Sequence, residues 1–583
     1  MDFNWARVID QRLHRQDAAT PTRTHIVVSW IAGILAVLFM GTVAARMAAP
    51  TIHPDEWGFL TNGQALIGHV EAPIPTGSFY PAGFGLVTGL AALVTGSISG
   101  AYRVTLFVNI GCAVATAWFA ARLARRTFNT SVDVSRLVAA LVLVLPGTLV
   151  SAMFAWPEIA ARLAFLGFIA LVHRAVLRTT VENIVVIAAF TGLMPGLHGR
   201  FTLLMPVIAL LSVWLWRLKR LSFTHLVTAG GAMVSGYAVS YFLNKFVKAS
   251  IYTESYDQEN RLLSRLFRPD LWPALLRTMV GQTWYLLATT VGVVGVGLVF
   301  AVHSAVKNRH ARESHESTWA ESVTLAVLAL SVFSIIFTGG LQLLHGNRGD
   351  HLMYGRYVEM MVPAVVVVAV VSLSRRGVFA SRSWLASLAV MPLLSIAYVV
   401  VDGGDGVKGG AGRRNIVFPN IVGADAARYV VSPGFLTFTA FFLAVGLSVW
   451  LIARRSRAWA IVCLVVLFAV GDITSGQRSL LTRSDNMEGQ TQTIDMVKSS
   501  GATVVGFDAG IRNDPSYYYL RYRLHPVRIV RFDFSSPGSA VQEDFTCLYG
   551  WPDKPPVDGQ WVIVAEEVGV ARVLWQRVGS AHC

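Results

Sequence analysis

Long apolar runs separated by short polar loops occupy the chain from about residue 25 to residue 475. Runs of about twenty residues match the length that a helix needs to cross the hydrocarbon core of a bilayer. The pattern therefore predicts about thirteen transmembrane helices. Their approximate positions are 25–46, 101–121, 135–154, 158–176, 182–196, 200–217, 223–246, 283–304, 320–340, 357–374, 384–401, 435–453 and 458–475.

Basic residues gather in the loops that follow alternate runs, all on the side of the N-terminus. Because cytoplasmic loops carry the excess of Lys and Arg, this side is predicted to be cytoplasmic. The first loop has the opposite character: it carries Asp55, Glu56 and Glu71, and no Lys or Arg occurs between Arg46 and Arg103. The basic clusters are Arg122, Arg125, Arg126, Arg174, Arg178, Arg217, Lys219, Arg220, Lys307, Arg309, Arg312, Arg375, Arg376, Arg454, Arg455 and Arg457.

This alternation divides the chain into three parts. Residues 1–24 form a cytoplasmic N-terminus, 25–478 a transmembrane domain, and 479–583 an extracytoplasmic domain. The apolar run at 82–97 is short and rich in Gly. If it were counted as a span, the cluster of Arg122, Arg125 and Arg126 would lie on the external side of the membrane. It is therefore predicted to lie in the membrane interface, within an external loop at 47–100.

The C-terminal part has the composition of a small soluble α/β domain. Short β-rich runs at 502–508, 527–534 and 561–567 alternate with a helix predicted at 517–523. Cys547 and Cys583 both lie here, and a disulfide between them is possible in an oxidising compartment. The fold class is thus an α-helical polytopic membrane protein with a small C-terminal α/β domain.

Composition agrees with a membrane protein. Of 583 residues, 54% are hydrophobic and 14% are charged, and the mean hydropathy is +0.53. The net charge of +15 comes from Lys and Arg in short loops, so it reports topology and does not indicate a nucleic-acid partner. The Gly-rich segment 403–412 lacks the strand and helix of a phosphate-binding loop, so it is interpreted as an external loop.

Several short motifs resemble one known superfamily. The external loop opens with His53-Pro54-Asp55-Glu56, continues with Tyr80-Pro81 before the interfacial run, and the second span ends in Ala-Arg-Leu-Ala-Arg-Arg. Together these resemble the GT-C superfamily of integral-membrane glycosyltransferases, which use polyprenyl-phosphate sugars. The acidic string is similar to that of lipid-linked mannosyltransferases, and the segment around Tyr80 to that of aminoarabinose and protein O-mannosyl transferases. The overall composition resembles actinobacterial cell-wall mannosyl- and arabinosyltransferases.

The resemblance implies roles for three carboxylates. Sugar transfer to a hydroxyl needs a base, and the resemblance makes Asp55 that base. Glu56 would orient Asp55 or help to hold a divalent cation. Glu158, at the external start of a span, would support the residues that act on the substrate, or would be a metal ligand. From spacing alone, Asp55 and Glu56 are equally consistent with a solvated loop pair, and Pro157-Glu158 with an ordinary helix start.

The candidate phosphate ligands are external arginines at membrane depth. Arg200 follows His198 at a tight turn, and Arg356-Tyr357 precedes another span. An Arg at this depth needs a partner, and a lipid phosphate would supply one through bidentate hydrogen bonds. Arg356 and Tyr357 fit the Arg-Tyr step of related transferases and are preferred over Arg200 and His198. The alternative is that both arginines snorkel to lipid head groups.

The loop at 248–282 has the spacing of an amphipathic helix, with Arg261, Arg265 and Arg268 on one side. Such a helix would anchor at the interface or cover the site as a lid that the donor gates.

The predicted function is transfer of a monosaccharide from a polyprenyl-phosphate donor to a glycan or lipid-linked acceptor on the external face of the plasma membrane, with inversion. The alternative is a glycolipid flippase, exporter or glycan ligase. Transport would place ionisable residues near mid-membrane, whereas the candidates here concentrate at external helix ends. A scaffold whose tail recruits partners would leave Asp55 and Glu56 without a task.

Overall fold

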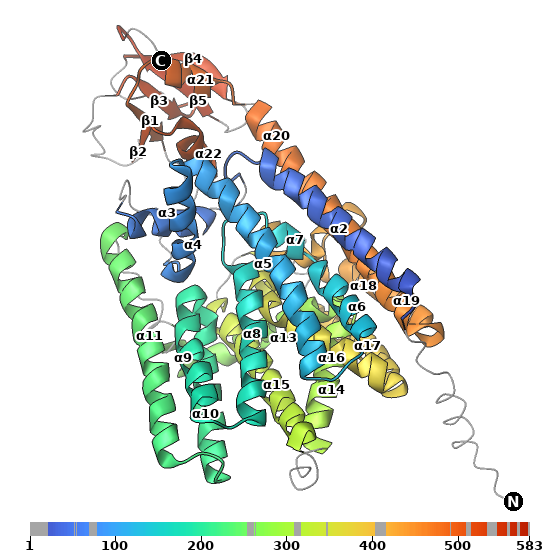
Figure 1. Ribbon diagram of the computed structural model, residues 1–583. Helices are drawn as coiled ribbons and strands as arrows, with labels where there is room; N and C mark the ends of the chain where they lie inside the picture. Colours follow the sequence, from blue (N-terminus) through green and yellow to red (C-terminus); the bar gives the residue numbers. More distant parts are fainter. Residues whose placement is uncertain are drawn as a thin grey trace, which may run out of the picture.

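The computed structural model shows a helical bundle with a small sheet-containing module at one end (Figure 1). The structure describes residues 21–51, 53, 55–68, 79–252, 262, 264–307, 316–344, 348–402, 416–489, 491–508, 515–532, 545–554, 556, 560–567, 572–580 and 583.

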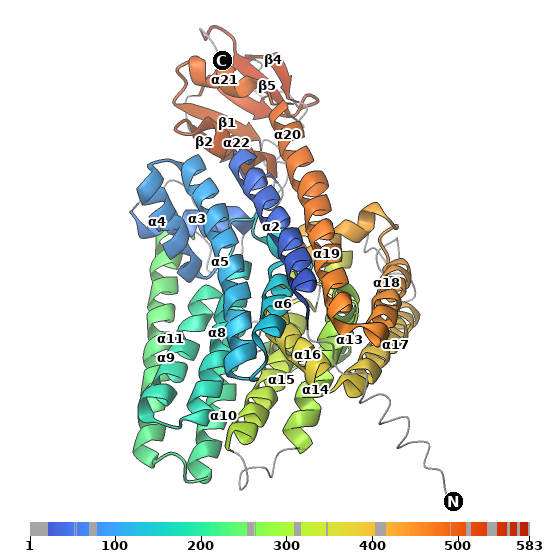
Figure 2. The ribbon, with the colours of Figure 1, turned by 45° about the vertical axis from the view of Figure 1, so that its right-hand side comes forward.

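The bundle is built mainly from long apolar helices, with shorter ones such as α6 and α7 among them. In both views α9 to α11 lie at one flank and α17 to α19 at the other (Figures 1 and 2). The helices are α2 (Arg23–Arg46), α5 (Ile98–Arg126), α6 (Val132–Leu143), α7 (Thr148–Ser151), α8 (Glu158–Leu177), α9 (Val181–Leu197), α10 (Leu204–Arg217), α11 (Phe223–Ile251), α13 (Trp272–Thr289), α14 (Val293–Lys307), α15 (Glu316–Gln342), α16 (Val362–Arg375), α17 (Gly377–Asp402), α18 (Phe435–Arg455) and α19 (Arg457–Ser475).

Ten helical segments of the described chain are long and apolar enough to cross a membrane, and α13 with α14 would make an eleventh. The chain is therefore a multi-pass membrane protein, as predicted.

The expected count of about thirteen straight spans needs correction at three places. Residues 135–154 divide into α6 and α7, since helix α6 stops before Pro146-Gly147. Helix α9, with 17 residues, is shorter than the roughly twenty residues that a straight span needs. The chain bends by 112° between α13 and α14, where Val291 and Gly292 have positive φ values of 47° and 86°. Hydropathy measures apolar length and does not detect such bends.

Shorter helices gather at the end of the bundle that faces the module. Helix α3 (Asp55–Leu66) packs on α4 (Gly85–Thr95), which exposes Leu86, Leu90 and Leu93 and so has the surface expected of an interfacial helix. The remaining turns are η1 (Ala82–Phe84), η2 (Gly199–Leu203), η3 (Pro269–Leu271), η5 (Gly349–Leu352), η6 (Gly355–Tyr357), η7 (Glu359–Met361), η8 (Phe418–Tyr429) and the π-helix η9 (Gly476–Leu481).

The C-terminal module follows helix α20 (Thr482–Gly489) and contains one five-stranded sheet. Its elements are α21 (Thr493–Ser499), β1 (Val504–Asp508), α22 (Pro515–Leu524), β2 (Arg528–Phe532), β3 (Cys547–Gly550), β4 (Trp561–Glu567) and β5 (Arg572–Arg577).

The strand order is β2-β1-β3-β5-β4, with β1 parallel to β2 and β3, and with β5 antiparallel to β3 and β4. The predicted strands correspond to β1, β2 and β4, whereas β3, β5 and α21 are additional. A disulfide joins Cys547 and Cys583, which the sequence left open.

Aromatic packing joins the module to the bundle. Trp57 of α3 contacts Tyr518 and Tyr522 of α22, with ring centroids 5.7 and 5.4 Å apart, and Tyr102 of α5 also meets Tyr522. The α22 tyrosines are buried. These rings hold the module against the helix that begins with Asp55, and they do not form an exposed platform for sugars.

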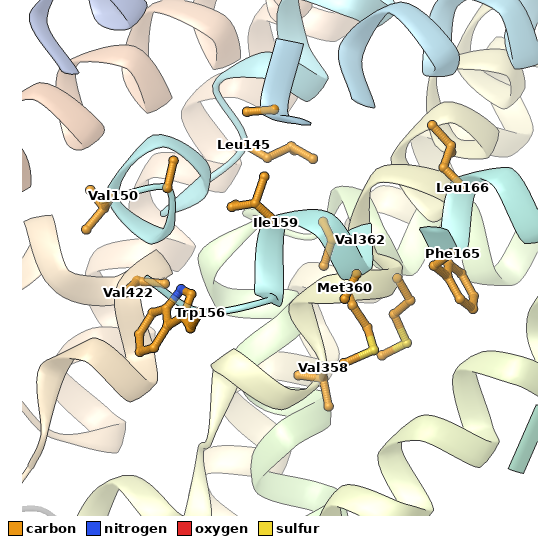
Figure 3. Close-up of a cluster of buried hydrophobic side chains, with 14 of the residues drawn as sticks. Leu145, Val150, Trp156, Ile159, Phe165, Leu166, Val358, Met360, Val362 and Val422 are labelled. Atoms are coloured by element: carbon orange, nitrogen blue, oxygen red, sulfur yellow. The ribbon is translucent and has the colours of Figure 1, made fainter. Parts of the chain in front are cut away.

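A dense apolar core lies beneath this end of the bundle. Figure 3 shows side chains from the first turns of α8 meeting those around η7 and η8. This packing holds the segments that carry Glu158 and Arg356. The labelled members of the core are Leu145, Val150, Trp156, Ile159, Phe165, Leu166, Val358, Met360, Val362 and Val422.

Candidate active site

Asp55 is the first residue of α3, and both of its carboxylate oxygens have defined partners. Tyr80 donates its hydroxyl to Oδ1 at 2.7 Å, and the Arg356 guanidinium donates to Oδ2 at 2.6 Å. A quarter of the side chain remains exposed. The carboxylate is therefore held in one orientation and can still be reached by another molecule.

The Tyr80 contact depends on a glycine one turn into α3. A Cβ at Gly58 would lie 2.2 Å from the Tyr80 ring, so only glycine lets that ring lie so close to the helix. The Tyr80 backbone is fixed as well: its N–H donates to the Tyr252 hydroxyl, and its carbonyl accepts from Asn62. Loop and helix thus place the phenol against Asp55.

Arg356 connects two carboxylates. It donates through Nη1 to Asp55 and through Nε to Glu158, and its guanidinium lies 4.1 Å from the centroid of the Trp156 ring. Arg356 and Glu158 are both buried. Buried charges of this kind persist only when they are paired and hydrogen-bonded, so the three groups form one unit.

The surroundings of Asp55 favour its ionised form. Burial opposes ionisation, but His53, Arg356 and the hydrogen bond from Tyr80 together lower the pKa of Asp55 below its usual range. Burial lowers the pKa of His53 to about 4, so its ring is neutral near pH 7 and Arg356 carries the stabilising charge there. Asp55 is accordingly a carboxylate at physiological pH.

Glu56 points elsewhere, although it is next to Asp55 in sequence. Successive residues of a helix diverge by about 100°, which turns Glu56 into the protein. Its Oε1 accepts a hydrogen bond from the Ala155 N–H at 2.8 Å, and the side chain is 1% exposed. Burial raises the pKa of Glu56 to about 8, so it is mainly protonated near pH 7. In the structure, Glu56 connects α3 to the loop before α8.

Arg200 forms a second buried cationic group beside Arg356. It donates to Gln342 at 2.7 Å, contacts the His198 ring, and lies over the ring of Tyr357. Burial and the two arginines lower the pKa of His198. Of the four predicted phosphate ligands, Arg200, His198 and Tyr357 therefore form one group, and Arg356 belongs to the adjoining one.

Several buried polar atoms around these groups have no hydrogen-bond partner within the described part of the chain. They are Nε of Arg200, Nε of Arg348, Nδ1 of His351 and Oε2 of Glu158. Orphaned buried donors and acceptors are costly unless a ligand or water meets them. The cluster is thus suited to an anionic ligand, since most of these atoms belong to cations or donors.

A buried network that the sequence analysis missed supports Arg356. Glu359 accepts from Arg162 at 2.6 Å and from the Tyr285 hydroxyl at 2.5 Å, and Tyr285 accepts from the Gly423 N–H. The available signal was a pair of charged residues inside apolar runs, Arg162 one turn after Glu158 and Glu359 three residues after Arg356. The network fixes η7 against α8, α13 and η8.

The predicted metal ligands Glu56 and Glu158 each have a protein partner. Glu56 binds Ala155 and Glu158 binds Arg356, and within the described residues no three His, Cys, Asp or Glu side chains form a group that could hold a metal ion. These residues do not fit a divalent cation as they stand, so no step below uses one.

The loop at 248–282 is described only in part, and Arg261 lies outside the described residues. Arg265 donates to the carbonyls of Leu341 and Gln342 at the end of α15, each at 3.0 Å, and Arg268 pairs with Asp270. Arg265 thus neighbours the Gln342 that holds Arg200. The lid stays a prediction.

Neither a known protein-family model nor a curated protein sequence matches the chain. Its structure is similar to that of ArnT from Cupriavidus metallidurans bound to undecaprenyl phosphate, with a TM-score of 0.54 at 14% identity over 96% of this chain and 100% of that one. The apo state of the same protein gives a TM-score of 0.52 at 13% identity over 95% and 98%. The chain therefore shares the fold of ArnT, as its resemblance to integral-membrane glycosyltransferases led us to expect.

Proposed function

We propose that this protein is a glycosyltransferase that moves a monosaccharide from a polyprenyl-phosphate donor to a glycan or lipid-linked acceptor. One observation carries the proposal: a partly exposed, ionised Asp55 is held by Arg356, next to buried arginine donors that lack partners. A base and a phosphate site side by side are what this reaction needs. The GT-C fold and the undecaprenyl phosphate bound to ArnT support a lipid-phosphate donor.

The donor phosphate binds between the two arginine groups. Arg200 presents its unpartnered Nε, and Arg356 is the adjoining cation. Tyr357 and His198 fix Arg200 from either side. A phosphate that joins Arg356 shares that guanidinium with Asp55 and Glu158, so donor binding weakens the pairing of Asp55.

The reaction is a direct displacement. The acceptor hydroxyl oxygen forms a bond to the anomeric carbon while the bond from that carbon to the phosphate oxygen breaks, which inverts the configuration and releases polyprenyl phosphate. The hydroxyl proton passes to Asp55, and the arginines stabilise the charge that develops on the phosphate. Arg356 weakens Asp55 as a base in the free protein, and donor binding restores its proton affinity.

Transport is less well supported than transfer. The buried Arg162–Glu359 ion pair lies one turn from the start of α8, on the same end of the bundle as Asp55. The charged groups of the candidate site thus gather at the end of the bundle where lipid head groups would lie, whereas transport would place ionisable residues near mid-membrane. We place this end of the bundle on the extracytoplasmic face of the plasma membrane, in line with the basic loops at the other end. Mannose and arabinose are the first sugars to test.

The direct test is incubation of the purified protein with a panel of polyprenyl-phosphate monosaccharides and measurement of free polyprenyl phosphate. Release that requires Asp55 supports the proposal. The absence of release with every donor and acceptor in the panel, from folded protein, would argue for the transport alternative, which reconstituted vesicles and a labelled glycolipid would then test.

A further inference from the structure

A cavity that the proposed reaction does not use lies between η8, η9 and the segment around α7. Its volume is about 270 Å³, and its wall is mainly apolar, formed by Val150, Phe154, Phe418, Val422 and Leu480 among others. Figure 3 shows Val150 and Val422 in the same region as Trp156. An apolar hollow of this size suits the lipid part of a ligand.

A basic hollow of about 390 Å³ adjoins this cavity. The two share Arg428, Ser479 and Arg483, and the second adds Arg478. Arg428 is neutralised by Asp425, at 2.9 Å. Within the described residues Arg478 and Arg483 pair with no carboxylate, although Arg483 donates to the Thr51 carbonyl. Two positive charges therefore remain at the mouth of an apolar cavity.

The local backbone explains how these charges come together. Residues Gly476–Leu481 form a π-helix, η9, between the two α-helices α19 and α20. Such wide turns are rare and are often found at functional sites. Ser479 in this turn donates to buried Asp425 at 2.5 Å and accepts from Arg428 at 2.7 Å. The turn thus ties η9 to η8 and sets Arg478 and Arg483 at the rim.

Aromatic contacts link the cavity to the arginine of the candidate site. Phe154 lines the cavity and stacks on Trp156, with centroids 4.2 Å apart, while Arg356 lies 4.1 Å from a Trp156 ring. Phe154, which lines the cavity, and Arg356, which belongs to the candidate site, therefore contact the same Trp156 side chain. The Thr51 carbonyl bound by Arg483 is only two residues from His53, which contacts Asp55.

We propose that this cavity binds the acceptor, and that the acceptor is an amphipathic lipid with a phosphate in its head group. The phosphate binds Arg478 and Arg483, the adjoining apolar chain lies against Val422 and Leu480, and a head-group hydroxyl extends past Trp156 to Asp55. The lipid-binding part stands on the cavity and its charges alone. The acceptor role rests on the proposed function.

Two full-length variants test the site. Arg478→Gln/Arg483→Gln removes both charges, and Arg454→Gln/Arg455→Gln is the matched control, since these exposed arginines end α18 away from the cavity. Binding of a fluorescent phosphatidylglycerol, which carries a phosphate and free hydroxyls, is measured in detergent with phosphatidylcholine and inorganic phosphate as competitors. The first variant should bind roughly tenfold more weakly or worse, because two charge-assisted contacts are lost. The control should match the unmodified protein.

A third variant tests the apolar wall. Ile416 also lines the cavity and is only half-buried, so Ile416→Trp narrows the cavity with little disturbance of the core. It should weaken phosphatidylglycerol binding while the charges remain. Equal binding by all variants, or competition by inorganic phosphate as strong as that by unlabelled phosphatidylglycerol, would overturn the site.

Transfer kinetics separate the two proposals. With an active donor, Arg478→Gln/Arg483→Gln should raise the KM for a phospholipid acceptor and leave the KM for the donor unchanged. A change in the donor KM alone would refute the acceptor role. Intact phosphatidylglycerol binding without transfer from any donor would refute the proposed function and leave the lipid site standing.

Discussion

Substitution of Arg356 tests two features of the site at once, because this residue holds two carboxylates and is also a proposed phosphate ligand. Arg356→Gln breaks the contact with Glu158, which is buried, and the 2.6 Å contact with Asp55, which is a quarter exposed. Removing one partner of a buried pair costs about 3–5 kcal/mol, whereas an exposed pair contributes about 0–1 kcal/mol. Most of the lost stability should therefore come from the uncompensated charge of Glu158.

A second substitution separates stability from donor binding. In Arg356→Gln/Glu158→Gln no buried charge is left unpaired, so the double variant should recover most of the stability. It should not recover donor affinity, because a lost charge-assisted hydrogen bond costs about 1.5–3 kcal/mol, or roughly 10- to 150-fold in Kd. Arg200→Gln is the comparison, and we expect it to weaken donor binding less than Arg356→Gln.

The assays are thermal unfolding in detergent and titration with a polyprenyl-phosphate sugar. If the double variant is as unstable as Arg356→Gln, the Arg356–Glu158 pair does not form as described. If Glu158→Gln restores donor affinity, Arg356 acts only through the carboxylates and our phosphate assignment is wrong.

Three further outcomes follow from the structure. The pKa of Glu56 is about 8 in the folded protein and near 4.5 in the unfolded chain, so the folded state holds an extra proton between these values and loses stability as pH rises through that window. Glu56→Gln should flatten this part of a plot of Tm against pH, and an unchanged slope would contradict the burial of the acid. Gly58→Ala should displace the Tyr80 ring and reduce turnover as much as Tyr80→Phe does, with little further loss in the double variant; additive losses would show that the two residues act separately. A cysteine introduced at Gly68 or at Asp553 should react with an impermeant reagent from outside intact cells, and labelling from the cytoplasmic side would reverse the orientation.

The local sequence predicted most membrane helices well, because the length and apolar composition of each run are enough to indicate a span. It predicted α2, α5 and α8 close to their observed limits. It could not predict the bend between α13 and α14, since that bend depends on two residues with positive φ inside an apolar stretch. Strand β3 was missed because its few residues are buried by neighbours on both sides, which leaves no alternating pattern.

The candidate residues were found individually, and their arrangement was not. Asp55 and Arg356 are 301 residues apart, and Glu158 and Arg356 are 198 apart, so only the fold brings them together. Adjacency in the sequence suggests that Asp55 and Glu56 act as a pair, yet helix geometry directs them to different surroundings. Arg162 and Glu359 are charges inside apolar runs, and such a charge generally requires a partner, but the sequence does not show that they are partners of each other.

The central claim is that the Asp55 carboxylate takes the proton of the acceptor. Asp55→Asn keeps the size of the side chain and most of its hydrogen bonding but cannot accept that proton. In a single-turnover assay with an active donor and acceptor, the rate should fall by about 10²- to 10⁴-fold while the donor Kd changes little. A rate near that of the unmodified protein, in a variant that unfolds at the normal temperature, would contradict the account and make Glu158 the next residue to test.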